Sequence, residues 1–119
     1  MRARRNRYAV ASFALAALVL GPAGAAHAVV AATVRGSGSD WRPARVTINA
    51  GETVRWRAVG NTHTVTAYGG GWSKDTRITA GESTRKTFNE TGVFRYYCTI
   101  HADVSGGTCS GMCGRVTVT

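Results

Sequence analysis

The sequence lacks a hydrophobic run long enough to cross a membrane. Its apolar N-terminal stretch, Tyr8–Leu20, has about 13 residues, whereas a membrane-spanning helix needs about 20. The stretch follows a basic segment, Met1–Arg7, and residues 26–28 (Ala-His-Ala) match the small-x-small pattern of a signal-peptide cleavage site. We therefore expect residues 1–28 to be a removable signal peptide and residues 29–119 to form one exported domain. An uncleaved signal anchor is the alternative.

Acidic residues are also few. The whole chain has six Asp and Glu against fifteen Lys and Arg, and four of those arginines belong to the predicted signal peptide. The exported domain keeps eleven basic residues against six acidic ones, a net charge of +5. Its arginines are scattered singly, without a basic run or a nucleic-acid-binding motif, so we expect no nucleic-acid partner. The charge favours acidic partners or an anionic surface, or it belongs to a solvated outer face.

The domain shows no amphipathic helix pattern and no internal repeat. In Thr53–Val59, the apolar residues Val54, Trp56 and Ala58 alternate with two arginines, as in a strand with one buried and one solvated face. Similar extended segments, separated by Gly- and Asn-containing turns, are residues 45–48, 63–66, 84–88, 93–98 and 115–119. This pattern predicts an all-β, Greek-key β-sandwich.

A group of metal-binding side chains lies near the C-terminus. Cys98 ends an alternating strand, so its sulfur should enter one end of the core; His101 follows three residues later and Met112 further on. His63 is the other histidine of the domain and also lies at the end of a strand. One thiolate, two imidazoles and a weakly bound axial thioether form the ligand set that selects copper for single-electron transfer. We therefore expect His63, Cys98, His101 and Met112 to bind one copper.

The three cysteines of the exported domain cannot all form disulfides within one chain. Cys98, Cys109 and Cys113 are an odd number, and an unpaired thiol in an exported protein needs an explanation. Binding of copper by Cys98 supplies one. Cys109 and Cys113 are then expected to form a disulfide that fixes the segment around Met112.

Residues 44–119 resemble the plastocyanin and amicyanin group of small blue copper proteins. Residues 51–56 and 61–66 resemble the strand and first histidine of the family, residues 94–101 its cysteine strand and second histidine, and residues 111–118 its methionine and final strand. The chain departs from the group between His101 and Met112. The ten-residue loop expected there, Ala102–Gly111, is longer than in plastocyanin or amicyanin, and the segment carries two additional cysteines.

This resemblance implies a cupredoxin-like fold and a type 1 copper site that exchanges single electrons with redox partner proteins. It also implies that His101 is partly exposed and that electrons enter and leave there, through a small apolar surface that docks partners transiently. Nearby arginines could steer partners with acidic surfaces. We expect a monomer without enzymatic activity, exported to the cell surface, the periplasm or the medium, with peripheral membrane association compatible with its charge.

Three other functions compete with electron transfer. A copper oxidase or nitrite reductase would need further copper sites, which His63 and His101 cannot build alone. A storage or delivery module for copper or zinc could use the same thiol and imidazole groups, although the Cys-x₂-His-x₁₀-Met order does not favour zinc. An immunoglobulin-like adhesion domain would not require these four side chains to converge.

Overall fold

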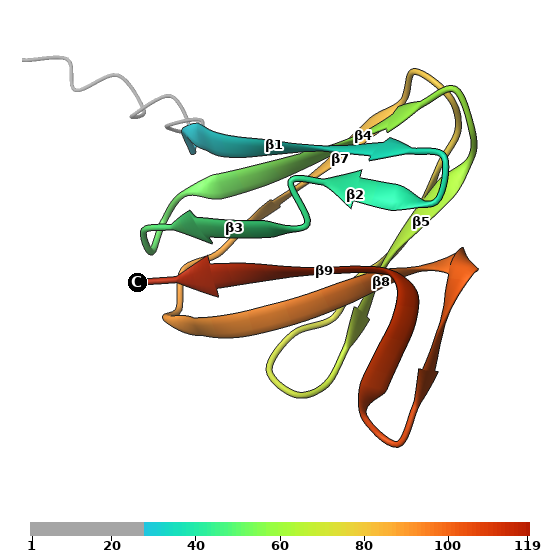
Figure 1. Cartoon of the computed structure of the whole chain (residues 1–119). Helices are drawn as coiled ribbons and strands as arrows, with labels where there is room; N and C mark the ends of the chain where they lie inside the picture. Colours follow the sequence, from blue (N-terminus) through green and yellow to red (C-terminus); the bar gives the residue numbers. More distant parts are fainter. Residues whose placement is uncertain (1–27) are drawn as a thin grey trace, which may run out of the picture.

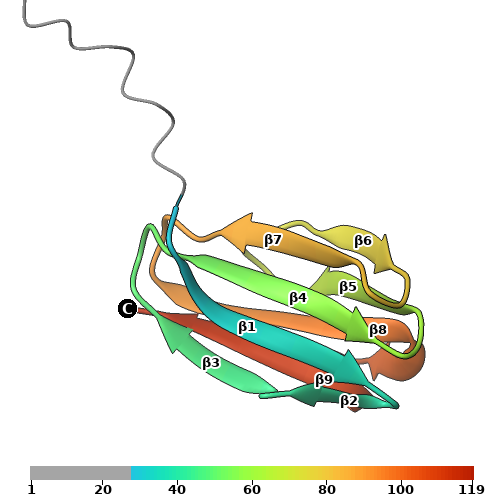
Figure 2. The ribbon, with the colours of Figure 1, turned by 90° about the horizontal axis from the view of Figure 1, so that it is seen from above.

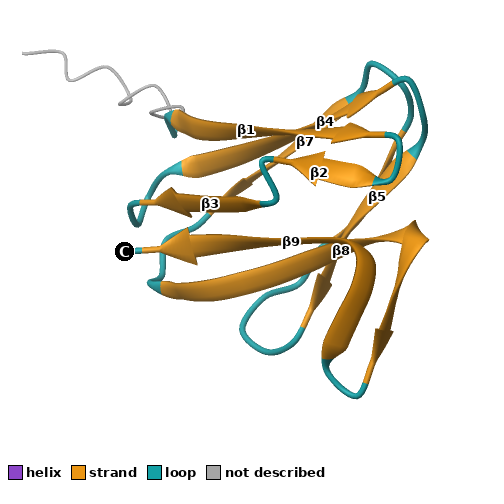
Figure 3. Cartoon of the chain, viewed as in Figure 1, coloured by secondary structure: helices purple, strands orange, loops and turns teal. Residues whose placement is uncertain are grey.

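The computed structural model describes residues 28–119, so the predicted signal peptide lies outside the described residues except for its last residue. All regular secondary structure in this part is β-strand (Figures 1 and 3), as the sequence predicts. Accordingly, these residues contain no helix that could span a membrane.

Nine strands within residues 28–119 form two sheets that face each other, with the four-stranded sheet in front in Figure 2. The strands of the four-stranded sheet, in spatial order, are β2 (Asp40–Arg42), β1 (Val30–Ser37), β4 (Thr53–Val59) and β7 (Ser83–Thr87). Those of the five-stranded sheet are β3 (Arg45–Ile48), β9 (Thr108–Val118), β8 (Gly92–Ser105), β5 (His63–Tyr68) and β6 (Asp75–Ile78). Strands β1 and β4 are parallel, as are β3 and β9, and the other pairs are antiparallel.

The core fills the space between the inner faces of the sheets. On β4, Val54, Trp56 and Ala58 are fully buried, which confirms the alternation seen in the sequence. On β8, Tyr96 and Cys98 are also fully buried. The Trp56 and Tyr96 rings meet edge to face, with centroids 5.3 Å apart, and so join the two sheets. The remaining core residues are Val34, Trp41, Ile48, Val65, Ile78, Phe88, Phe94, Ala102, Met112, Val116 and Val118.

The segment expected to be a loop, Ala102–Gly111, is a β-hairpin, so that prediction was wrong. Residues 102–105 of β8 pair with residues 108–111 of β9, and Gly106 and Gly107 form the turn, both with positive φ. A Gly-Gly pair between two extended segments is a known hairpin signal, because such a turn needs left-handed backbone at both central residues. In Figure 1 this hairpin bends sharply away from the body of the sandwich.

The pairing of β8 with β9 is interrupted where the candidate metal ligands lie. The two strands pair at Tyr97 with Cys113 and again at Ala102 with Gly111. Four residues of β8, Cys98 to His101, therefore lie opposite the single residue Met112 of β9. This wide bulge breaks the ladder at the end of the molecule opposite to the C-terminus (Figure 1) and brings Met112 beside the Cys98–His101 segment.

Candidate metal site

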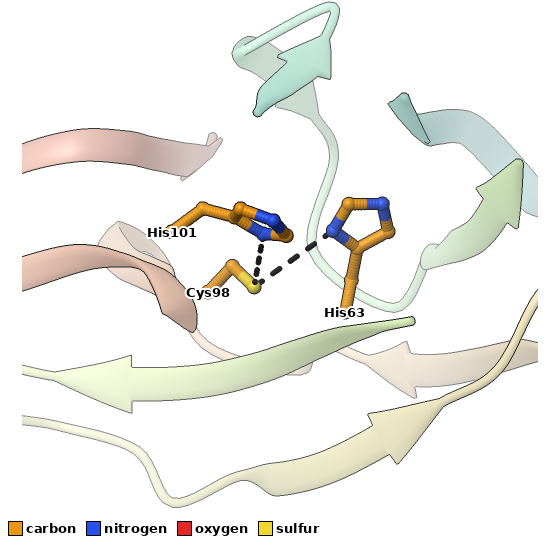
Figure 4. Close-up of side chains that lie close together, drawn as sticks. All are labelled: His63, Cys98 and His101. Atoms are coloured by element: carbon orange, nitrogen blue, oxygen red, sulfur yellow. Dashed lines mark hydrogen bonds between the residues drawn. The ribbon is translucent and has the colours of Figure 1, made fainter. Parts of the chain in front are cut away.

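The structure brings His63, Cys98 and His101 together at this end of the sandwich (Figure 4). His63 is the first residue of β5, and the other two lie in the bulge of β8. The Cys98 Sγ lies 3.8 Å from the His63 Nδ1 and 3.5 Å from the His101 Nδ1, and the three donor atoms all lie within 4.8 Å of one another. Cys98 and His101 follow His63 by 35 and 38 positions in the sequence. The fold nevertheless directs one sulfur and two nitrogens to a common point.

Burial differs between the three side chains. His63 and Cys98 are fully buried, whereas His101 is half-buried. Beside His101, Ile100 is 48% exposed, which places an apolar side chain on the surface next to the accessible imidazole. The partial exposure of His101 that the sequence predicted is therefore confirmed.

Thr64 joins the two segments that carry the site. Its backbone N–H donates a hydrogen bond to the Cys98 Sγ at 3.3 Å. Its hydroxyl oxygen accepts a hydrogen bond from the Thr99 backbone N–H at 2.8 Å and lies 3.0 Å from the Thr99 hydroxyl. These contacts fix β5 to the Cys98 segment and place a backbone donor at the sulfur.

Met112 is also at the site and is 1% exposed. Gly36 on β1 shows how closely it approaches: a Cβ added to Gly36 would lie 2.9 Å from the His63 Cδ2 and 3.2 Å from the Met112 Cε. The same Cβ would lie 2.8 Å from a ring carbon of Trp41. Trp41 in turn contacts the His63 ring, with centroids 5.6 Å apart. Strands β1 and β2 thus close the site from the side.

A disulfide between Cys109 and Cys113 brackets Met112, which confirms the predicted pairing and leaves Cys98 as the free cysteine of the described residues. Its two Cα atoms are 6.1 Å apart, whereas four residues of straight strand would span about 13 Å. Strand β9 therefore bends sharply between them. Gly111 allows the bend, because its φ is +105° and a Cβ there would collide with the His101 carbonyl oxygen.

The electrostatics of the site favour metal binding. Burial lowers the pKa of His63 below its usual value of 6.5, and the charge of nearby His101 lowers it further, although the Gly36 backbone opposes the shift slightly. The imidazole is therefore neutral near pH 7, which is the form that binds metals. The other ring nitrogen of His63, Nε2, is buried and has no hydrogen bond of good geometry.

The donor atoms fit a single metal ion of the first transition row. A metal about 2.3 Å from the sulfur and about 2.1 Å from each nitrogen would separate sulfur from nitrogen by roughly 3.6–3.8 Å, for angles between tetrahedral and trigonal. The observed separation of 3.8 Å lies within this range, and that of 3.5 Å lies just below it. Thiolate and imidazole donors with a neighbouring thioether suit copper.

The sequence named the residues that converge, but it missed those that position them. Trp41 and Gly36 lie in an N-terminal segment for which no strand was predicted, and no sequence signal marks them as neighbours of His63. The structure also identifies the backbone N–H of Thr64, next to His63, as the donor to the Cys98 sulfur.

A two-sheet sandwich with one cysteine and two histidines at one end defines the class of small copper proteins with the cupredoxin fold. Residues 28–119 match the family described as copper binding proteins, plastocyanin/azurin family. The chain therefore belongs to this copper-binding family, and its cofactor is a single type 1 copper. The resemblance stated from the sequence is confirmed.

Several solved structures share the fold. The chain is similar to amicyanin from Paracoccus versutus, with 31% identity and a TM-score of 0.60 over 79% of this chain and 83% of that chain. It is also similar to the copper-containing nitrite reductase of Thermus scotoductus SA-01, with 25% identity and a TM-score of 0.61 over 76% of this chain but only 22% of that chain. A purple cupredoxin from Nitrosopumilus maritimus, with 20% identity and a TM-score of 0.59 over 74% of this chain and 99% of that chain, shares the fold.

Proposed function

We propose that the protein is an exported electron carrier and that His63, Cys98 and His101 hold its copper, with Met112 as the weak axial ligand. The observation that carries this proposal is the convergence of one buried sulfur and two imidazole nitrogens within 4.8 Å of one another. The copper, when bound, supplies a one-electron couple between its cuprous and cupric states. The long His101–Met112 segment is compatible with axial binding, because the bulge of β8 places Met112 opposite Cys98–His101.

The surrounding residues would keep the ligands in one geometry in both oxidation states. His63 is fixed by burial and by the Trp41 ring, and Cys98 by the hydrogen bond from Thr64. A donor to the sulfur withdraws charge from the thiolate and so contributes to setting the reduction potential. Because these side chains need not move when an electron arrives or leaves, the exchange can be fast.

Electrons would enter and leave at His101. It is the accessible imidazole of the three side chains, and Ile100 beside it offers an apolar contact for a partner. A small contact of this kind suits a transient encounter between redox proteins, which must also dissociate quickly. We propose that the partners are redox proteins, that those with acidic surfaces are favoured by the basic charge, and that the carrier is a monomer.

Adding copper to the purified protein tests this function. We expect an intense blue thiolate-to-copper absorption band and reversible reduction by one electron. The Cys98→Ser variant should lose the colour but keep its β-sheet circular dichroism, whereas the matched double variant Cys109→Ser/Cys113→Ser should stay blue. A colourless tight complex in the unaltered protein would instead support a storage or delivery role, and a blue Cys98→Ser variant would refute the ligand assignment.

We further propose that the protein is not an enzyme by itself. Only two histidines occur among the described residues, and both already belong to the proposed electron-transfer site. The similar nitrite reductase is much longer than this chain, which corresponds to less than a quarter of it. A role as electron donor to an enzyme is compatible with this comparison. Removal of residues 1–28 during export and a domain formed by residues 29–119 remain part of the proposal.

A further inference from the structure

The outer face of the four-stranded sheet carries an ordered group of five arginines, here called the arginine face. Arg42 on β2, Arg35 on β1 and Arg57 on β4 are direct neighbours across three strands. Two positions away from Arg57 on β4, Arg55 is the direct neighbour of Arg85 on β7. Neighbouring strands are about 4.8 Å apart, and residues two positions apart on a strand are separated by roughly 6.7 Å. The five arginine positions therefore form a compact grid on the outer face of this sheet, which is the sheet in front in Figure 2.

Almost nothing on this face neutralises the arginines. Asp40 is the single acidic residue in the four strands, and its contact with Arg42 at 3.6 Å is the only ion pair in the part of the chain that the structure describes. The Asp40 and Arg42 side chains are both more than half exposed, so this ion pair is weak. Arg55 is half-buried between its neighbours, and its Nε is buried without a hydrogen-bond partner.

The fold does not explain this concentration of charge. Like charges placed directly opposite each other on adjacent strands destabilise a sheet. The strand interiors need polar residues on their solvated face, but Thr or Ser would serve equally well, as at Thr33 and Ser83. A grid in which four of the five arginines lack an ion pair, and which does not stabilise the sheet, indicates an anionic ligand outside the protein.

The chemistry of the face favours phosphate groups over a protein surface. Its other side chains are mainly hydroxyls, including Thr33, Ser37 and Ser83, and arginine with Ser and Thr is the usual composition for phosphate contacts. It offers no aromatic anchor, because Trp41 and Trp56 of the same sheet both point into the core. Val59 is the exposed large apolar residue of these strands, at the end of β4. Protein interfaces depend on buried aromatic and apolar anchors, which are missing here.

From this geometry we propose that the arginine face docks the domain flat on a membrane containing anionic phospholipids. A sheet face presents its charges in one layer, so all five arginines can approach a planar layer of phosphates together. The interaction needs no inserted side chain and so would be peripheral and reversible. The candidate copper site lies at one end of the strands on the inner side of this sheet, because Gly36 and Trp41 contact it while Arg35 and Arg42 beside them are exposed on the outer face. The half-buried His101 would therefore stay accessible to redox partners while the domain is bound.

Vesicle binding by the domain starting at Val29, which contains all nine strands, tests the proposal. The copper-loaded protein should bind vesicles of phosphatidylglycerol and phosphatidylcholine but not vesicles of phosphatidylcholine alone, and the binding should weaken with salt. The triple variant Arg35→Gln/Arg57→Gln/Arg85→Gln should bind about 100-fold more weakly, at about fivefold per arginine. The single variants Arg35→Gln and Arg85→Gln should each lose about fivefold, so the answer does not depend on the triple variant folding.

The other sheet provides a control with the same change in net charge. Arg45, Arg115 and Arg95 are neighbours across β3, β9 and β8, and with Tyr68 they line an open hollow. The variant Arg45→Gln/Arg95→Gln/Arg115→Gln should keep most of the vesicle binding. Equal losses in the two triple variants would show that only bulk charge matters and would overturn the proposal, as would an absence of binding. Displacement by inorganic phosphate beyond that by chloride of equal ionic strength would also overturn it, in favour of a site for free phosphate.

This inference does not depend on the copper assignment. The Cys98→Ser variant keeps the arginine face and should bind vesicles as the unaltered protein does. Failure of the electron-transfer proposal and failure of the membrane proposal are therefore separate experimental results.

Discussion

Gly36 is the residue whose lack of a side chain matters most for the candidate copper site. It lies on β1 with its backbone against Trp41, His63 and Met112, and its φ is not in the left-handed region. The space around it, and not backbone strain, is therefore what requires glycine. A single added methyl group would press on His63, on Met112 and on the Trp41 ring that packs against His63.

Replacing Gly36 by Ala should disturb the site and destabilise the protein. The added Cβ would lie closer than 3.0 Å to Trp41 and His63, and overpacking of this kind typically costs about 1–3 kcal/mol. We expect a lower midpoint in denaturant unfolding and a shifted visible spectrum of the copper protein. Gly70→Ala is the matched control, because nothing lies within 4 Å of a Cβ at Gly70 and its φ is not positive. Equal behaviour of the two variants would contradict this role of Gly36.

Met112 can be replaced by a residue of similar volume that cannot bind a metal. Met112→Leu should keep the copper, since the buried side chain is replaced by one of nearly equal size. It should raise the reduction potential, because loss of a weak donor disfavours the cupric state more than the cuprous state. Voltammetry of the two proteins measures the difference, and an unchanged potential would mean that the axial position is not filled by Met112.

At the scale of single residues, sequence chemistry predicted the functional groups but not their supports. Cys98, His101 and His63 could be named because a thiolate and two imidazoles have few roles together in a small exported domain. Gly36 and Thr64 could not, because their roles arise from close approach and from a backbone N–H. Neither property is visible in a side-chain type.

The bulged pairing of β8 with β9 is the element that assembles most of the site. Three of the four proposed ligands lie within it, Cys98 and His101 on one strand and Met112 on the other. Its shape depends on two local features, the left-handed Gly111 and the Cys109–Cys113 disulfide that holds the bend. The proposed axial ligand is therefore positioned by a short segment with its own covalent restraint.

Removing the disulfide should loosen Met112 without removing the copper. In the double variant Cys109→Ser/Cys113→Ser we expect the free energy of unfolding to fall by about 2 kcal/mol, as estimated for closure of so short a loop. We also expect a changed reduction potential, since the bend beside Met112 is no longer held. Denaturant unfolding and voltammetry measure the two effects. A lower stability with an unchanged potential would show that the disulfide stabilises the hairpin but does not position Met112.

Strands with a strong alternation of apolar and polar residues were predictable from the sequence. Strands that depend on pairing with neighbouring strands were not. Thr53–Val59 has the alternation of a half-buried strand and forms β4 as expected. The continuation of β8 beyond His101 was not predicted, although Gly106-Gly107 carries a hairpin signal, because the resemblance to plastocyanin and amicyanin implies a loop there. Strand β2 has only three residues, too few for a periodic pattern.

The whole molecule separates part of its charge by position. In the described residues the arginines lie in strands, whereas three of the six acidic residues, Glu52, Glu82 and Glu90, lie in the turns between them. Composition determines the net charge but not this separation, because the neighbours of Arg35 or Arg115 are set by strand order and register. Composition therefore predicted a basic protein, and only the fold defines where an anionic surface could bind.

The sandwich also holds the proposed ligands rigidly, because they come from strands of one sheet and are covered by β1 and β2 of the other. His63 and Cys98 are fully buried and Met112 nearly so, so little space remains for rearrangement. A rigid site is the physical condition for fast electron exchange in this account. Ligand identity and rigidity can be measured together in the copper-loaded protein.

X-ray absorption at the copper edge, recorded in the cupric and cuprous states, tests the central claim most directly. We expect one short sulfur and two nitrogen neighbours, from Cys98, His63 and His101, at nearly the same distances in both states. A copper shell without a short sulfur neighbour, or one that loses a nitrogen on reduction, would contradict it.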